Sequence, residues 1–151
     1  MKIAIGSDHA GIDLKEVIKN QLIRGRDDYT HFDVGIYDLN HFPVLDYPDI
    51  SKEVTNLVIH QGYDYGILIC GTGQGMAMSA NKKQKIRAGL CVDNSSAKLA
   101  RQHNNCNILC LGGRTTGHAT ALDIVDAFLN TEFEGGRHLK RINKFSKIWP
   151  V

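Results

Sequence analysis

The chain has 151 residues and a formal net charge of +2, and this length suits one domain with a single core. So small a charge does not indicate a nucleic-acid partner. No apolar run approaches the roughly 18 residues of a membrane span, and no N-terminal segment is typical of a signal peptide, so we expect a cytoplasmic protein. Four cysteines without a CxxC pair do not resemble a disulfide framework.

Short apolar runs alternate with longer amphipathic ones, which is typical of a parallel α/β sheet. Strands are predicted at 3–5, 32–34, 66–70, 87–92 and 107–111, and helices at 14–22, 50–61, 76–82, 95–103, 118–129 and within 134–141. The run that ends at Cys70 is continuously apolar, as expected at the centre of a sheet. We therefore predict one domain, residues 1–151, with an α/β Rossmann-like three-layer fold: a central parallel five-stranded sheet with helices on both faces.

Ligands bind beyond the carboxyl ends of the strands in such sheets, which directs attention to residues 7–9, 70–75, 93–94 and 112–114. Gly71-Thr-Gly-Gln-Gly75 follows the central strand, and its glycines would let the backbone N–H groups approach an anion. A dinucleotide motif is excluded because Met76 stands where its third glycine would be, and no Gly-Lys-Ser/Thr of a P-loop follows. A tight strand-to-helix turn without a ligand remains the structural alternative.

Cys70 comes directly before these glycines. A thiol at the start of a helix loses its proton more readily, which suits a nucleophile or a general base. Enolisation needs such a base beside donors that hold the developing oxygen charge. The alternative is a buried structural thiol, which is how we interpret Cys91, Cys106 and Cys110. A zinc site that combines Cys106 and Cys110 with His103 is disfavoured, because Cys110 lies within an apolar run.

Two polar segments flank other predicted strands. Asp8 and His9 follow the first strand; Asp8 suits a helix N-cap and His9 an exposed loop position. His103 stands at a predicted helix end, where the helix dipole favours histidine. As functional groups, these histidines would exchange protons near neutral pH.

Arg137 and Arg141 are four residues apart and would share one face of a helix. A solvated basic face is the common explanation of such a pair. The functional alternative is a bidentate clamp on a phosphate, which Arg114, after Gly112 and Gly113, would join.

Several motifs, taken in chain order, resemble the type B ribose-5-phosphate isomerases, in the superfamily that includes the galactose-6-phosphate isomerase subunits. The resemblance covers essentially the whole chain. Its motifs are Gly6-Ser-Asp-His-Ala-Gly11, Ile67-Leu-Ile-Cys-Gly-Thr-Gly-Gln-Gly75, Ala80-Asn-Lys82, Ile86-Arg-Ala88, Ala100-Arg-Gln-His-Asn104 and Glu134-Gly-Gly-Arg-His138.

The resemblance implies roles for particular residues. Cys70 would take the proton from C2 of the open-chain sugar and return it to C1, and the Thr72 hydroxyl would help to move a proton between the two oxygens. His103, assisted by Asp8, would open the furanose ring. The implied substrate-binding residues are Asp8, His9, Gly71, Thr72, Gly73, Gln74, Gly75, Asn104, Arg114, Arg137 and Arg141.

The resemblance also implies a homodimer, with sites completed across the subunit interface and with pairing of dimers left open. Residues 131–151 would contribute to the dimer and the phosphate site. No metal or organic cofactor is implied. One branch of the family lacks the cysteine and uses a glutamate after the glycines; with Cys70 present and Met76 at that position, this chain resembles the cysteine branch.

The expected reaction is the interconversion of ribose 5-phosphate and ribulose 5-phosphate. One alternative is a hexose-6-phosphate isomerase subunit for galactose or allose phosphate, since the segment Tyr37 to Pro48, with His41, Phe42, Asp46 and Tyr47, would shape the pocket rim. Another is a sugar-phosphate-binding or nucleotide-binding module without catalysis, although such a module would not need Cys70 or His103.

Overall fold

A computed structural model describes residues 1–24, 26–35 and 45–145 of the chain. Five parallel strands form its central sheet: β1 (Lys2–Ser7), β2 (Thr30–Gly35), β3 (Tyr65–Cys70), β4 (Ala88–Leu90) and β5 (Ile108–Gly112). The strand order is β2-β1-β3-β5-β4, so the apolar run that ends at Cys70 is the central strand. This confirms the predicted parallel sheet.

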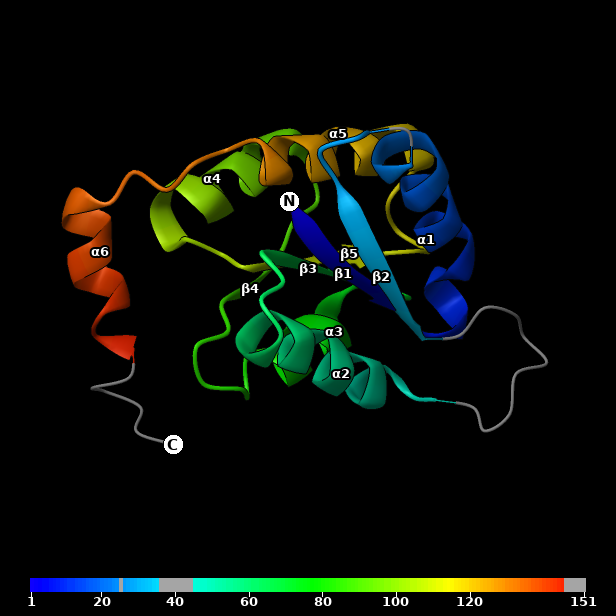
Figure 1. The fold of residues 1–151 in the computed structure, drawn as a ribbon, viewed down its shortest axis with the longest axis horizontal. Coiled ribbons are helices and arrows are strands. Elements are labelled where there is room, and N and C mark those ends of the chain that lie inside the picture. The colour runs from blue at the N-terminus through cyan, green and yellow to red at the C-terminus, as the bar shows by residue number, and fades with distance from the viewer. Residues whose placement is uncertain (25, 36–44, 146–151) are drawn as a thin grey trace.

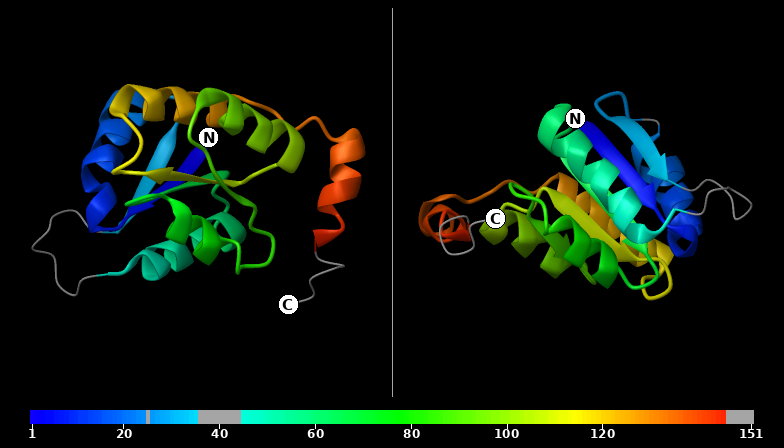
Figure 2. Two further views of the ribbon diagram at one scale, coloured as in Figure 1. Left: turned by 180° about the vertical axis from the view of Figure 1, so that it is seen from behind. Right: turned by 90° about the horizontal axis from the view of Figure 1, so that it is seen from below.

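Helices cover both faces of the sheet, as predicted (Figures 1 and 2). One face carries α1 (Ile12–Ile18), which follows the 3-10 turn η1 (His9–Gly11) and continues into the π-helical turn η2 (Lys19–Ile23), together with α4 (Asn94–Asn104) and α5 (His118–Leu129). The other face carries α2 (Tyr47–His60) and α3 (Gln74–Ala80). The last helix described, α6 (Gly136–Ile142), lies at one end of the molecule and packs against α4 (Figure 1).

The central strand is apolar throughout because both of its faces are covered. Side chains alternate along a strand. Ile67 and Ile69 therefore join the core beneath α1, α4 and α5, whereas Leu68 and Cys70 join the core beneath α2 and α3. This packing holds the end of β3, and with it Cys70, in a fixed place.

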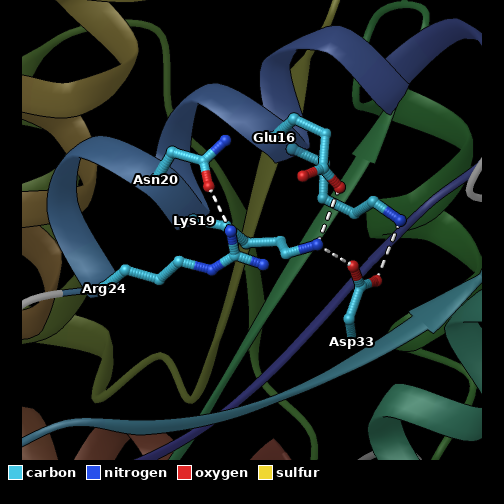
Figure 3. Close-up of polar contacts among 6 residues, drawn as sticks. Glu16, Lys19, Asn20, Arg24 and Asp33 are labelled. Carbon is cyan, nitrogen blue, oxygen red and sulfur yellow. Dashed lines mark hydrogen bonds and ion pairs between the residues drawn. The ribbon is translucent and has the colours of Figure 1, made fainter.

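A buried ion cluster fastens α1 and η2 to β2 (Figure 3). The Lys15 side chain is fully buried, and its Nζ donates to Oδ1 of Asp33 at 2.8 Å. Lys19 Nζ donates to the other oxygen of Asp33 and to Oε1 of Glu16, the latter at 2.7 Å. Burial opposes the charge on Lys19, but the hydrogen bonds from Asp33 and Glu16 outweigh it and raise the pKa of Lys19 above its ordinary value of 10.5.

Several predicted boundaries differ by a few residues: β4 is shorter than the predicted 87–92, and α3 begins and ends two residues before the predicted 76–82. The loop expected to run to Pro48 ends earlier, because α2 begins at Tyr47, where Asp46 forms a capping box with Asp49 and the proline lies in the first turn, which tolerates it. Tyr37, His41 and Phe42 of that predicted loop lie outside the described residues. Within the described part of the chain, no helix has the length and apolar character needed to cross a membrane.

Candidate active site

The carboxyl ends of β1, β3 and β5 bring one group of the predicted site residues together. Asp8, next after β1, donates its N–H to the carbonyl of Ile69 at 3.2 Å, which places it beside the end of β3. Its side chain is buried, and Oδ1 accepts the N–H of Ala10 at 2.9 Å, so Asp8 is the N-cap of η1, as the sequence indicated. His9 is exposed in the same turn.

Cys70 ends β3 and is 5% exposed. Its Sγ accepts the backbone N–H of Gly73 at 3.2 Å. Gly73 has a φ of +78°, which a side chain would strain, and this conformation turns the loop back toward the thiol. The Thr72 side chain is next to it, and its Oγ1 accepts the N–H of Gln74 at 3.4 Å. Cys70 and the loop N–H groups therefore form one compact unit.

The loop after β5 packs against this unit. Gly113 donates its N–H to the carbonyl of Cys70 at 2.7 Å, and Arg114 donates to that of Gly71 at 3.0 Å. The Arg114 side chain runs along Gly71, with Cδ 3.6 Å from where a Cβ of that glycine would lie. Arg114 is exposed, so its charge is available to a ligand at this edge.

Tyr47 forms a wall beside the glycine loop. Its Cε2 lies only 2.9 Å from the position that a Cβ on Gly75 would take, so the ring rests on the glycine backbone. The sequence analysis placed Tyr47 at the pocket rim but did not count it among the site residues, because only the fold brings the start of α2 to Gly75.

The other three cysteines differ from Cys70 in their surroundings. Burial raises the pKa of Cys91 to about 12 and that of Cys106 to about 11, and it raises the pKa of Cys110 well above its ordinary value. These thiols stay protonated at neutral pH and act as small apolar side chains. The structural interpretation of Cys91, Cys106 and Cys110 therefore agrees with the structure.

A second group of predicted site residues gathers around α6 and the end of α4. His103 and Asn104 are the last two residues of α4, and Arg137 and Arg141 lie on α6, where both are exposed. The rings of His103 and His138 stack with centroids 4.2 Å apart and planes 5° from parallel. The sequence prediction that the two arginines share a short helix is confirmed.

Within one chain, the first group lies at the carboxyl ends of the strands and the second group lies near their amino ends. Helix α4 begins after β4 and ends just before β5, so it runs against the strands and places His103 near their amino ends. Cys70 pairs with Gly112 at the carboxyl end of β5, whereas Ile108 starts that strand. Five residues of strand span about 13 Å. In Figure 1, α6 accordingly lies at the far left, while β1 leads toward α1 at the right.

Glu134 and His138 belong to the second group, although the sequence analysis quoted them only as parts of a motif. Donor atoms of His103, Glu134 and His138 lie within 4.8 Å of one another, whereas ligand atoms about 2.0–2.2 Å from a tetrahedral zinc ion stand roughly 3.3–3.6 Å apart. Arg137 Nε donates to Nε2 of His138 at 3.3 Å, so that lone pair is engaged and a cation already lies beside it. The cluster therefore suits proton exchange and anion binding better than metal binding.

Comparison with known proteins identifies the family of the chain. Residues 3–145 match the family described as Ribose/Galactose Isomerase. The chain is 41% identical over 148 residues to ribose-5-phosphate isomerase B of Escherichia coli K12, covering 97% of this chain and 95% of that protein.

Solved structures extend the match to the whole fold. Ribose 5-phosphate isomerase B of Thermotoga maritima superposes with a TM-score of 0.90 at 47% identity, with 97% of each chain covered. The Mycoplasma genitalium enzyme with bound ribulose-5-phosphate gives a TM-score of 0.85 at 41% identity, covering 97% of this chain and 95% of that one. The chain therefore belongs to the ribose/galactose isomerase family.

Proposed function

We propose that the protein interconverts ribose 5-phosphate and ribulose 5-phosphate through a cis-enediolate, with Cys70 as the base. The observation that carries this proposal is the 3.2 Å contact between Cys70 Sγ and the Gly73 N–H. It joins a proton acceptor and a set of N–H donors in one loop, and enolisation of an aldehyde needs both within one site. The names of the relatives, one of them with bound ribulose-5-phosphate, support the same reaction.

The proposed chemistry balances within the sugar. The Cys70 thiolate removes the proton from C2 of the open-chain aldose, and the C2–H electron pair forms the C1–C2 double bond while the C1 oxygen takes the negative charge. Backbone N–H groups of residues 71–75 hold that charge. The Thr72 hydroxyl relays a proton from the C2 oxygen to the C1 oxygen. Cys70 then delivers its proton to C1, which leaves a ketone at C2.

The second group supplies the remaining roles. His103, assisted by Asp8, protonates the ring oxygen and opens the furanose, and Asn104 holds the sugar. Arg137 and Arg141, with His9 and Arg114, bind the phosphate. Because the two groups lie at opposite ends of the strands in one chain, we infer a homodimer in which a second copy supplies one of them and residues 131–145 help to complete the partner's site; the rest of the expected segment, 146–151, lies outside the described residues.

Exposed apolar side chains support this dimer. Five large ones are 45–63% exposed and come from α3, α4, α6 and the segments after β4 and α6: Met78, Val92, Leu99, Leu139 and Phe145. Leu99 and Phe145 also line a cavity of about 520 Å³ along the edge strand β4, and Asn104 lines the same cavity. Apolar surface of this kind beside a proposed site residue is typical of an interface between subunits.

All four cysteines are free thiols, which supports a reducing, cytoplasmic setting.

The test uses NMR to monitor turnover of three substrates in the presence of EDTA. The substrates are ribose 5-phosphate, galactose 6-phosphate and allose 6-phosphate at equal concentration. We expect ribulose 5-phosphate to form from ribose 5-phosphate with a higher kcat/KM than either hexose phosphate gives. A higher kcat/KM on a hexose phosphate would assign the chain to hexose metabolism instead. Binding without turnover of any of the three would reject the enzyme.

A further inference from the structure

Glu134 contacts the proposed ring-opening acid and its stacked neighbour at once. Its Oε2 lies 3.9 Å from Nε2 of His103 and 3.5 Å from Nε2 of His138. The two imidazole rings lie in parallel planes, so both Nε2 atoms face the same carboxylate oxygen. A single carboxylate oxygen therefore lies beside both rings.

The fold holds this carboxylate in place through the end of α4. The Glu134 N–H donates to the carbonyl of Gln102 at 3.1 Å, one residue before His103. Three residues earlier in the segment, the Thr131 carbonyl accepts Nε of Arg101 at 3.2 Å, and that arginine is buried. Segment 131–134 is thus tied at two points to the last turn of α4, and Glu134 moves with His103 as one unit.

His138 serves as the flat surface on which the His103 ring rests. It is buried, and Arg137 donates Nε to its Nε2 at 3.3 Å, so this nitrogen carries no proton. Burial, then the charge of His103 and of Arg137, lower the pKa of His138, which favours its neutral ring. A neutral ring stacked at 4.2 Å fixes the plane of the His103 ring without competing for its proton.

We propose that Glu134 is a positioning residue, which acts through His103, and that with His138 it orients the His103 ring for opening the sugar ring. This inference rests on the proposed function, in which His103 delivers a proton to the furanose oxygen. Beside this ring pair, Arg137 and Arg141 disfavour positive charge on His138, and the Glu134 carboxylate opposes them. The same three-part logic, an acid or base oriented by a further group, recurs in hydrolytic triads.

The test uses two reactions that differ in their need for ring opening. Conversion of ribose 5-phosphate starts from a furanose, whereas ribulose 5-phosphate has its C5 oxygen phosphorylated and stays open. In D₂O, exchange of a C1 hydrogen of ribulose 5-phosphate for deuterium needs the Cys70 base but not the His103 acid. Both rates are followed by NMR for the wild type and for Glu134→Gln, which keeps the shape and removes the charge.

We expect Glu134→Gln to lower kcat for ribose 5-phosphate about tenfold and to leave deuterium exchange into ribulose 5-phosphate within about twofold of the wild type. Glu134→Asp should recover part of the loss. Glu132→Gln, which removes the same charge from the same exposed segment, is the matched control and should change neither rate.

Two results would overturn the inference: unchanged conversion in Glu134→Gln, or an equal fall in conversion and exchange, which is what a merely structural role would produce. Failure of the proposed function would give a different result. Deuterium exchange into ribulose 5-phosphate would then persist in Cys70→Ala, independently of the rates measured for Glu134→Gln. Circular dichroism and thermal unfolding of each variant establish that the comparison is between folded proteins.

Discussion

The Gly73 N–H points at the sulfur of Cys70 and donates a hydrogen bond to it across 3.2 Å. This bond exists because Gly73 adopts a φ of +78°, which turns the loop back over the end of β3. It stabilises negative charge on the sulfur, and it also fixes the remaining N–H groups of the loop relative to the base. In the proposed reaction, both the base and the oxyanion donors thus depend on the backbone of one residue.

Gly73→Ala should damage both stability and catalysis. A Cβ there would lie 2.5 Å from Leu90 Cδ1 and would strain a left-handed backbone, so we expect a loss of about 1–3 kcal/mol in the free energy of unfolding and a lower kcat. Gly62→Ala is the control, because Gly62 has a φ of +71° with nothing within 4 Å. It should lose stability through strain alone and keep its kcat; equal kcat in the two variants would refute the role of the Gly73 N–H.

Mixed dimers test whether each site draws on two chains. Cys70→Ala and Arg137→Ala subunits, each with low activity alone, should give up to about a quarter of the wild-type rate when mixed, because half the dimers are mixed and each of these holds one intact site. The control mixes Cys70→Ala subunits with Asp8→Asn subunits. Both residues belong to the group at the carboxyl ends of the strands, so this mixture should recover no activity. Recovery in neither mixture would show that sites do not form across the interface.

The buried ion cluster predicts a large loss of stability for Asp33→Asn. The substitution removes the carboxylate that both Lys15 and Lys19 contact, and breaking a buried ion pair in this way costs about 3–5 kcal/mol. Asp28→Asn breaks an exposed pair with Arg26, which solvent screens, and should lose far less stability than Asp33→Asn. Urea denaturation of both variants provides the comparison, and similar midpoints would contradict it.

The lowered pKa of His138 predicts a loss of stability in acid. Burial, His103 and Arg137 disfavour the charged ring in the folded state, so the folded pKa lies below the ordinary 6.5. The contribution of His138 to the free energy of unfolding should then be fully present above pH 6.5 and be lost as the pH falls below that value. His138→Phe, which keeps a flat ring, should show a weaker fall between pH 7 and 5 in urea midpoints. Parallel curves for the two proteins would be inconsistent with this account.

The central sheet and the glycine loop were predictable because their signals are local. A β-branched apolar run marks a strand covered on both faces, and the glycines after Cys70 mark a close backbone approach. The N-cap role of Asp8 was predictable for the same reason, since it depends on residues two positions apart.

The rest depends on contacts between distant segments. Lys15 looks like a solvated residue in the sequence, but in the fold Asp33 on β2 approaches it and accepts a hydrogen bond from its buried ammonium group. Glu134 and His138 reach His103 because the chain turns at Gly135 and Gly136, with φ of +67° and +52°, where α6 begins. His103 and Cys70 lie at opposite ends of the strands because α4 runs against them. No motif in the sequence indicates this separation.

The most direct test of the account is kcat for ribose 5-phosphate in Cys70→Ala, measured beside Cys91→Ala. Cys91 is an equally buried thiol whose pKa of about 12 excludes it as a base at neutral pH, so its substitution controls for the loss of a buried sulfur. We predict that Cys70→Ala lowers kcat by about 10²–10⁴, the usual contribution of a general base, with a much smaller change in KM. Cys91→Ala should retain most of the activity. A kcat for Cys70→Ala close to that of Cys91→Ala would contradict the account and require another base.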